Sequence, residues 1–208
     1  QVSTVGKPDR CRIEVERAMN SSTRSSETLL DAAVALIADS GLDNLTLSAV
    51  AERAGVSRAT AYREFGDKDG LVSAVGRNEI GRMVAAAYRE IDLFAPAAEV
   101  ARSSTLFALR YLRKHAAFSY IRRHEPARLL DVAITHGGSE LNLVETVAAI
   151  AAPLIAARDD SALALSPVQA AEVVVRAVLS HALIQRSNLT DEQIADTVAR
   201  AVIREQDA

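Results

Sequence analysis

Disulfide chemistry is the first thing that this sequence lacks, because its 208 residues include a single cysteine, Cys11. One cysteine excludes an internal disulfide framework and is typical of a reducing compartment, so we expect a cytoplasmic protein. No apolar run reaches about 18 residues, which predicts that no segment spans a membrane. Charged residues between Arg10 and Arg17 interrupt any apolar stretch at the start, so a secretory signal is not expected there.

Aromatic residues and prolines are also scarce, and tryptophan is absent, whereas apolar residues make up 49% of the chain. Alanine, leucine, valine and isoleucine dominate this apolar share, and they recur at three- and four-residue spacing with no strand-like alternation. The chain is long enough to bury a substantial core. We therefore expect an all-α fold.

The sequence lacks the residue spacings that support catalysis or metal binding. Its four histidines, His115, His124, His136 and His181, include no pair four residues apart and no Glu-x-x-His segment, which are the spacings of helical metal sites. There is no glycine-rich phosphate loop, and no histidine lies near Cys11 in the sequence to act as a general base for the thiol. The sequence therefore predicts neither an enzyme nor a bound cofactor or metal.

Net charge is −3, far from the strongly basic balance that alone indicates a nucleic-acid-binding protein. Residues 46–68 carry four basic and three acidic side chains. Phosphate binding there would depend on the placement of the charges and not on a general positive field.

The most informative segment is TLSAVAERAGVSRATAYREF, residues 46–65. Thr46 is suited to cap a helix over 47–54, and Gly55 to end it, because glycine adopts the left-handed conformation at little cost. Ser57 would cap a second helix over 58–65.

Two short helices joined by a tight glycine turn predict a helix-turn-helix, whose second helix lies in the DNA major groove. Val56, Ala61 and Phe65 would face inward, which leaves the outer face to Arg58, Thr60, Tyr62 and Arg63. The alternative is an ordinary corner between two helices of a bundle.

In its wider context, this segment resembles the N-terminal domain of the TetR family of bacterial transcriptional repressors. The residues that carry the resemblance are Leu29, Ala32, Ala33, Leu36, Ile37, Gly41, Thr46, Ala51, Ala54, Gly55, Val56, Ser57, Thr60, Tyr62, Phe65, Lys68 and Leu71. The resemblance covers about residues 24–75 and implies a DNA-binding domain there, followed by a ligand-binding and dimerisation domain over 76–208. Two residues depart from the family pattern: Glu64 stands where a histidine or another aromatic residue is frequent, and Ala59 replaces a frequent glycine.

The resemblance also implies which side chains contact DNA. Arg58 is the best candidate for bidentate pairing with guanine, and Lys68 matches a position that binds phosphate. Arg63 is open to two interpretations, a phosphate contact or a surface partner of Glu64 or Asp67. The complete expected set is Thr46, Ser48, Arg58, Ala59, Thr60, Tyr62, Arg63 and Lys68.

Helices are expected along most of the remaining chain. Asp67 should cap a long helix that connects the two domains, and Thr190 with Gln193 resembles a capping box. The expected ranges are about 23–40, 68–92, 97–115, 127–136, 139–158, 167–187 and 191–205, with a short segment over 118–124 and Pro126 at the beginning of the helix that follows it. Residues 1–23 are interpreted as a mostly flexible arm, in which a short helix over about 10–19 is possible. The arm is either a solvated tail or a segment whose arginines enter the minor groove.

For the second domain, the resemblance implies a pocket for a small-molecule effector and a four-helix dimer interface. Residues available to line the pocket are Phe107, Arg110, Tyr111, His115, Phe118, Tyr120 and His136, each of which has a core or surface role as an alternative. Residues expected at the interface are Val174, Val178, Ile184, Ile194, Val198 and Val202, although the last two helices could instead close the core of one chain.

Together, these features predict a ligand-responsive repressor that binds a palindromic double-stranded DNA operator as a homodimer. The alternative function is a helix-turn-helix protein that acts through protein partners without binding DNA.

Overall fold

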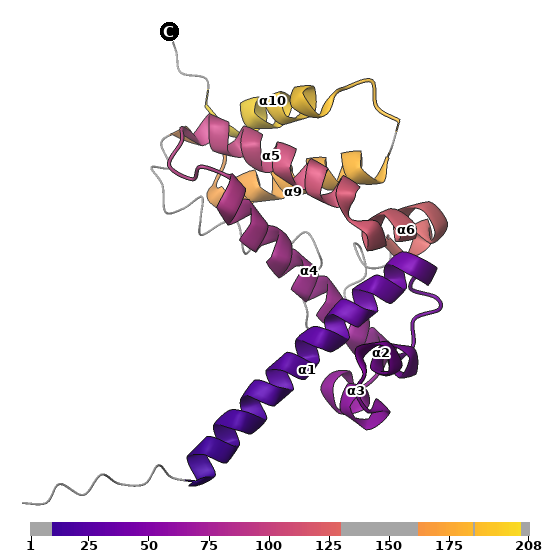
Figure 1. Cartoon of the computed structure of the whole chain (residues 1–208). Helices are drawn as coiled ribbons and strands as arrows, with labels where there is room; N and C mark the ends of the chain where they lie inside the picture. Colours follow the sequence, from indigo (N-terminus) through magenta and orange to yellow (C-terminus); the bar gives the residue numbers. More distant parts are fainter. Residues whose placement is uncertain (1–9, 130–161, 185, 205–208) are drawn as a thin grey trace, which may run out of the picture.

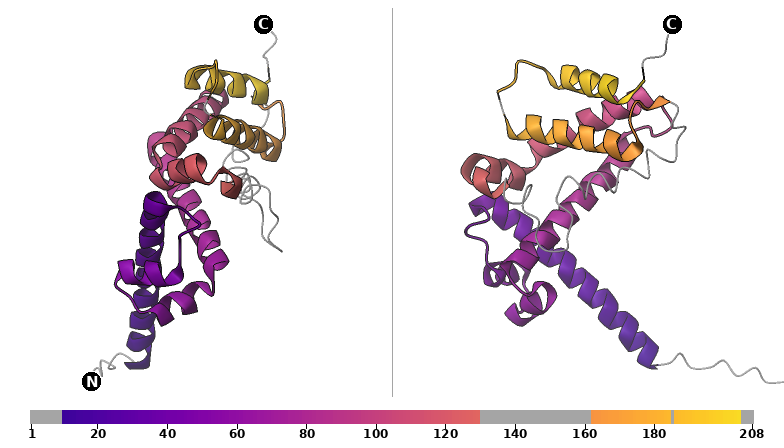
Figure 2. Two further views of the ribbon diagram at one scale, coloured as in Figure 1. Left: turned by 90° about the vertical axis from the view of Figure 1, so that its right-hand side faces the viewer. Right: turned by 180° about the vertical axis from the view of Figure 1, so that it is seen from behind.

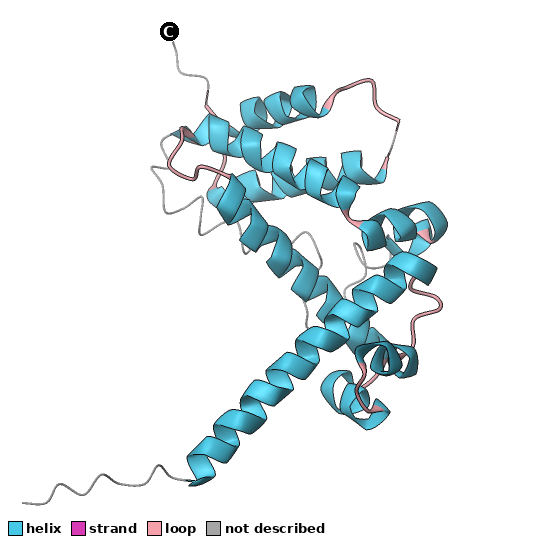
Figure 3. Cartoon of the chain, viewed as in Figure 1, coloured by secondary structure: helices cyan, strands magenta, loops and turns pink. Residues whose placement is uncertain are grey.

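The computed structural model describes residues 10–129, 162–184 and 186–204, and this part of the chain consists of helices and loops (Figure 3). Its only strand-like pairing is an isolated antiparallel bridge between Leu163 and Ile203. None of the helices in these ranges is both long enough and apolar enough to cross a membrane. The prediction of an all-α fold is confirmed. The helices are α1 (Arg10–Ser40), α2 (Leu47–Ala54), α3 (Arg58–Phe65), α4 (Lys68–Glu90), α5 (Ala97–Lys114), α6 (Ala116–His124), α9 (Pro167–Leu183) and α10 (Asp191–Val202).

The N-terminal domain consists of α1, α2, α3 and the beginning of α4, which crosses α1 (Figures 1 and 2). Its core forms where the apolar stripe of α1 packs against the other helices. The largest side chains that are completely or almost completely buried in this core are Leu29, Ile37, Leu45, Val50 and Leu71. Ala117 and Ile121 of α6 pack against the same core, so a helix from the second half of the chain completes it.

The start of α1 differs from the prediction. The helix begins at Arg10 and continues without interruption to Ser40, so it starts well before the predicted start at about residue 23. The physical reason is that residues 10–40 contain neither glycine nor proline to end a helix. The first half of α1 extends away from the remaining helices (Figures 1 and 2).

Most predicted helix ends lie within a few residues of the observed ones. The ranges 47–54 and 58–65 are confirmed, and α10 begins with the expected capping box of Thr190 and Gln193. Helix α9 ends at Leu183 instead of about residue 187. Residues 126–129 are helical, as expected after Pro126. The rest of that predicted helix and the one expected over 139–158 lie outside the described residues.

The second domain is built on α5, against which α9 and α10 pack (Figure 1). Its core contains Leu109, Val178, Ile194 and Val198. Four residues expected at a dimer interface, Val178, Ile194, Val198 and Val202, are at most 5% exposed within one chain, so they close the core of this chain, which was the alternative interpretation. Their apolar stripes are covered by this chain's own helices. Of the other two expected interface residues, Val174 is partly buried against the same core and Ile184 is 63% exposed.

Leu109 tests the importance of this core, because it is fully buried whereas Leu189 is 47% exposed. We expect Leu109→Ala to lower the free energy of unfolding by about 2–5 kcal/mol, through lost apolar burial and the cavity left behind. Urea denaturation of both variants measures this. Leu189→Ala, the same chemical change at an exposed site, should cost less than about 0.5 kcal/mol. Equal losses at the two positions would contradict the assignment of Leu109 to the core.

Candidate nucleic-acid interface and ligand hollow

The helix-turn-helix is held by local hydrogen bonds that its own sequence provides. The hydroxyl oxygen of Thr46 accepts the N–H of Ala49 at 3.1 Å, and Gly55 has φ = 68° in the left-handed region. The Ser57 hydroxyl oxygen accepts the N–H of Thr60, also at 3.1 Å. Ala61 of α3 is completely buried. These contacts fix which face of α3 points outward.

The outward face of α3 carries side chains suited to reading DNA. Tyr62 is 51% exposed, and Arg58, one helical turn earlier, is also exposed. Within the described residues, neither Arg58 nor Arg63 forms an ion pair, which leaves their guanidinium groups available for phosphate or base edges. The alternative pairing of Arg63 with Glu64 or Asp67 is not observed.

Two further expected contacts, Thr46 and Lys68, lie at helix N-termini beside α3. The ammonium group of Lys68 donates to the backbone oxygen of Asp43 at 2.9 Å, and an ammonium has three N–H donors in all. The Thr46 hydroxyl accepts from the backbone, so its own proton can still be donated to a phosphate oxygen. The charge of Arg53, in contrast, is paired with Asp39 at 2.6 Å.

The remaining expected residues differ in accessibility. Ala59 is exposed, whereas Ser48 and Thr60 are half-buried, and the Thr60 hydroxyl lies 2.8 Å from the Ser57 hydroxyl. The cationic groups left at the motif are those of Arg58, Arg63 and Lys68. Phosphate binding there would depend on the placement of these three groups and not on a general positive field.

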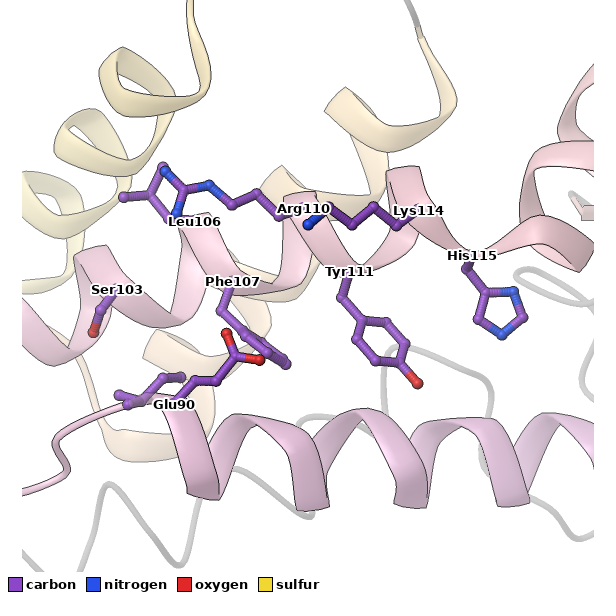
Figure 4. Close-up of a pocket in the computed structure, with 9 residues that line it drawn as sticks. Glu90, Ser103, Leu106, Phe107, Arg110, Tyr111, Lys114 and His115 are labelled. Carbon is purple, nitrogen blue, oxygen red and sulfur yellow. The ribbon is translucent and has the colours of Figure 1, made fainter.

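A hollow with a volume of about 610 Å³ opens between the end of α4 and the length of α5 (Figure 4). Aromatic rings at four-residue spacing form a row along α5, with centroids 5.7 Å apart for Phe107 and Tyr111 and 6.0 Å apart for Tyr111 and His115. In Figure 4 these three rings point toward α4. The lining residues are Glu90, Ile91, Ser103, Leu106, Phe107, Arg110, Tyr111, Lys114 and His115.

Four of the expected pocket residues, Phe107, Arg110, Tyr111 and His115, thus lie along this hollow. Phe118 and Tyr120 belong to α6 and do not line it, and His136 lies outside the described residues. The sequence reasoning missed five lining residues. Ser103 and Lys114 share the helical spacing of Phe107, and Leu106 lies four residues before Arg110, so all three could have been found from helical spacing. Glu90 is the last residue of α4 and Ile91 follows it, and only the packing of α4 on α5 reveals these two.

His115 is fixed at the edge of the hollow by hydrogen bonds from both ring nitrogens. Its Nδ1 accepts the N–H of Phe118 at 3.1 Å and so caps α6. The proton of the neutral ring therefore lies on Nε2, which donates to a carboxylate oxygen of Glu79 at 2.7 Å. Glu79 belongs to α4, so this contact joins α4 to the junction of α5 and α6.

The charges around Glu79 continue this connection toward α1. The hydrogen bond from His115 is the largest effect on the pKa of Glu79; together with the positive charge of Arg82 it outweighs burial and lowers that pKa below 4.5. Arg82 in turn pairs with Asp31 of α1. Burial, and then the negative charge of Glu79, raise the pKa of Tyr111. Together, these groups connect the hollow to the N-terminal domain.

The lowered pKa of Glu79 predicts a pH dependence of stability. A carboxylate whose folded pKa is depressed stabilises the fold above its unfolded pKa, and this contribution is lost as pH falls through the folded pKa. We expect Glu79→Gln to destabilise the protein near neutral pH, and the gap to wild type to shrink as pH falls from about 5 to about 3. Urea denaturation across this range measures the gap, with Glu52→Gln at an exposed position of α2 as control. A gap that is independent of pH would contradict the prediction.

Comparison with known proteins identifies the N-terminal domain. Residues 29–75 match the domain described as "Bacterial regulatory proteins, tetR family". A BetI transcriptional regulator of Paraburkholderia phymatum is 34% identical over 108 residues, which is 48% of this chain and 55% of that protein. An HTH-type transcriptional regulator of Mycobacterium bovis is 32% identical over 123 residues, covering 58% of this chain and 61% of that protein. The chain thus spans about half to three-fifths of the length of these relatives.

Solved structures show the same fold over most of the chain. The repressor QsdR of R. erythropolis, described as a TetR-family protein, superposes with a TM-score of 0.61 at 21% identity, over 89% of this chain and 99% of that one. The TetR-family repressor AlkX from a Dietzia strain has the same TM-score and identity over 84% and 90%. The matched domain, the regulators to which it is related and the shared fold agree: residues 29–75 form a domain of the TetR family of bacterial regulatory proteins, and most of the chain has the fold of TetR-family structures.

Proposed function

We propose that this protein is a ligand-responsive transcriptional repressor that binds a double-stranded DNA operator in the cytoplasm. The observation that carries the proposal is the outer face of α3, where exposed Arg58 and Tyr62 lie one turn apart with no ion-pair partner for the arginine among the described residues. Thr46 and Lys68 flank this helix with donors for phosphate. Helix-turn-helix proteins divide their contacts in this way. Phosphate contacts beside the recognition helix fix its position on the duplex, and contacts from that helix to the bases specify the sequence.

Self-association belongs to the same proposal. A two-fold dimer would place two α3 helices on half-sites about one DNA turn apart, and the operator would then be palindromic. Because the stripes of α9 and α10 that contact α5 are already covered, the interface would have to use other surface, such as the region of the exposed Ile184.

A small molecule bound in the hollow would act by changing the relative populations of conformations that do and do not bind DNA. The hollow is suited to this role because its wall is α4, the helix that leads directly from the helix-turn-helix to α5. The contacts of Glu79 with His115, and of Arg82 with Asp31, tie that wall to both domains.

The DNA-binding proposal is tested with an operator selected from random oligonucleotides by the wild-type protein, followed by fluorescence anisotropy at several salt concentrations. We expect Arg58→Ala to reduce discrimination between selected and random DNA by about tenfold to a hundredfold. Lys68→Ala should weaken binding to both DNAs alike, because one phosphate contact is lost. The salt slope, which is the steepness with which the logarithm of the binding constant falls with the logarithm of the salt concentration, should decrease by about one.

Arg200→Ala, at an exposed position of α10 in the other domain, is the matched control and should change neither quantity. If no DNA is enriched in the selection, or if binding is insensitive to both Arg58→Ala and Lys68→Ala, the protein acts through another partner and the proposal fails.

The ligand hollow generates a separate expectation. A compound that both raises the melting temperature and releases the selected DNA should lose both effects in Tyr111→Ala, since the Tyr111 ring forms part of the wall. Tyr88→Ala, the same change at a 48% exposed position of α4, should respond as the wild type does. Thermal-shift and anisotropy measurements on the two variants distinguish these results. Equal responses would place the effector elsewhere.

A further inference from the structure

The loop over residues 41–46, between α1 and α2, is held by a carboxylate from the second half of the chain. Glu125 follows the last residue of α6, and its side chain accepts the N–H of Leu42 at 2.7 Å and the N–H of Asp43 at 3.1 Å. Hydrogen bonds in which one partner is charged are about twice as strong as neutral ones. The backbone of this loop is therefore fixed by a residue more than 80 positions away in the sequence.

The close approach of α6 to this loop depends on Gly41. Gly41 has φ = 84°, and a Cβ atom at this position would overlap Oε1 of Glu125 and the ring of Tyr120. On the other side, the loop is held by the buried side chains of Leu42 and Leu45. Because the loop is in contact on both sides, its position relative to α6 is fixed.

Asp43, which Glu125 holds, contacts a residue of the DNA interface. The backbone oxygen of Asp43 accepts the hydrogen bond from Lys68, and its carboxylate pairs with Arg128 at 2.9 Å. Thr46, the cap of α2, follows three residues later. Two side chains that follow α6, those of Glu125 and Arg128, thus fix Asp43, and Asp43 fixes the ammonium group of Lys68.

We propose that Glu125 is a positioning residue for DNA binding, which acts through Asp43 and Lys68 although it is not part of the reading helix. A lysine side chain loses rotamer freedom when it binds, and a carbonyl that holds the ammonium beforehand removes part of that cost. Two of its three N–H donors then remain for a phosphate oxygen. This inference rests on the proposed function, because it assigns to Glu125 a part in the same DNA contact.

The test is Glu125→Gln, which keeps the size of the side chain and removes the negative charge that the two backbone N–H groups face. With the selected DNA, we expect affinity to fall several-fold and the salt slope to fall by about one, as for Lys68→Ala. Glu172→Gln is the matched control, since Glu172 pairs with Arg176 on the exposed side of α9 at 2.7 Å. It should change neither the affinity nor the slope.

A double-mutant cycle separates positioning from a general loss of stability. If Glu125 acts through Lys68, adding Glu125→Gln to Lys68→Ala should cost little more than Lys68→Ala alone, because the shared contact has already been lost. Purely additive losses, or a Glu125→Gln variant with an unchanged salt slope, would overturn the proposal. Glu125→Asp, which keeps the charge but shortens the reach, should lower the slope in the same direction and supplies the test if Glu125→Gln does not fold.

Amide hydrogen exchange gives a readout that does not involve DNA. The amides of Leu42 and Asp43 should exchange faster in Glu125→Gln than in the wild type. In Glu172→Gln they should exchange at the wild-type rate. Unchanged protection of these two amides would overturn the positioning role even if affinity falls. Failure of the wild type to bind any DNA would overturn both proposals, whereas wild-type binding with an unaffected Glu125→Gln would overturn this one alone.

Discussion

The buried face of the second half of α1 is the surface on which the rest of the molecule is assembled. Leu29, Ala33 and Ile37 on this face contact the core that α2, α3, α4 and α6 share. Apolar burial drives this assembly but is not directional, so it does not by itself fix how far one helix slides along another. The polar contacts at the two ends of the core supply that information: Arg82 with Asp31 on one side, and Glu125 with the loop after α1 on the other.

These polar contacts matter more for geometry than for stability. Arg82 and Asp31 are 44% and 58% exposed, and ion pairs of that kind contribute little to the free energy of folding. Glu79 and His115 are both less than 20% exposed, and each nitrogen of the histidine is used. Because a buried polar group without its partner is costly, this pair strongly favours a single arrangement of α4 against the start of α6.

The parts of the fold that could be predicted from the sequence are those that depend on nearby residues. Thr46, Gly55, Ser57 and Asp67 act on backbone groups within about four residues, so local chemistry was enough to place α2, α3 and the start of α4. The row of rings at Phe107, Tyr111 and His115 was likewise accessible from helical spacing.

The errors share a different cause. The apolar stripe containing Ile194 and Val198 showed that α10 is covered, but the sequence does not specify whether α5 or a second chain covers it. The roles of Glu79 and Glu125 depend on partners 36 and 83 residues away, which no spacing rule connects. In residues 10–23, the apolar periodicity is too weak to indicate a helix, although no glycine or proline interrupts one there.

The meeting of Gly41 with α6 has a consequence for exchanging parts between related regulators. A chimera that joined the N-terminal domain of this chain to the second domain of another regulator would treat the two domains as independent modules. Here the space above Gly41 is filled by Tyr120 and Glu125, so the halves are complementary in shape as well as covalently linked. A second domain joined to residues 1–75 would need an end of α6 that fits against Gly41. Conversely, the second domain of this chain would not fit an N-terminal domain with a larger residue than glycine at that position, because that side chain would overlap Tyr120 and Glu125.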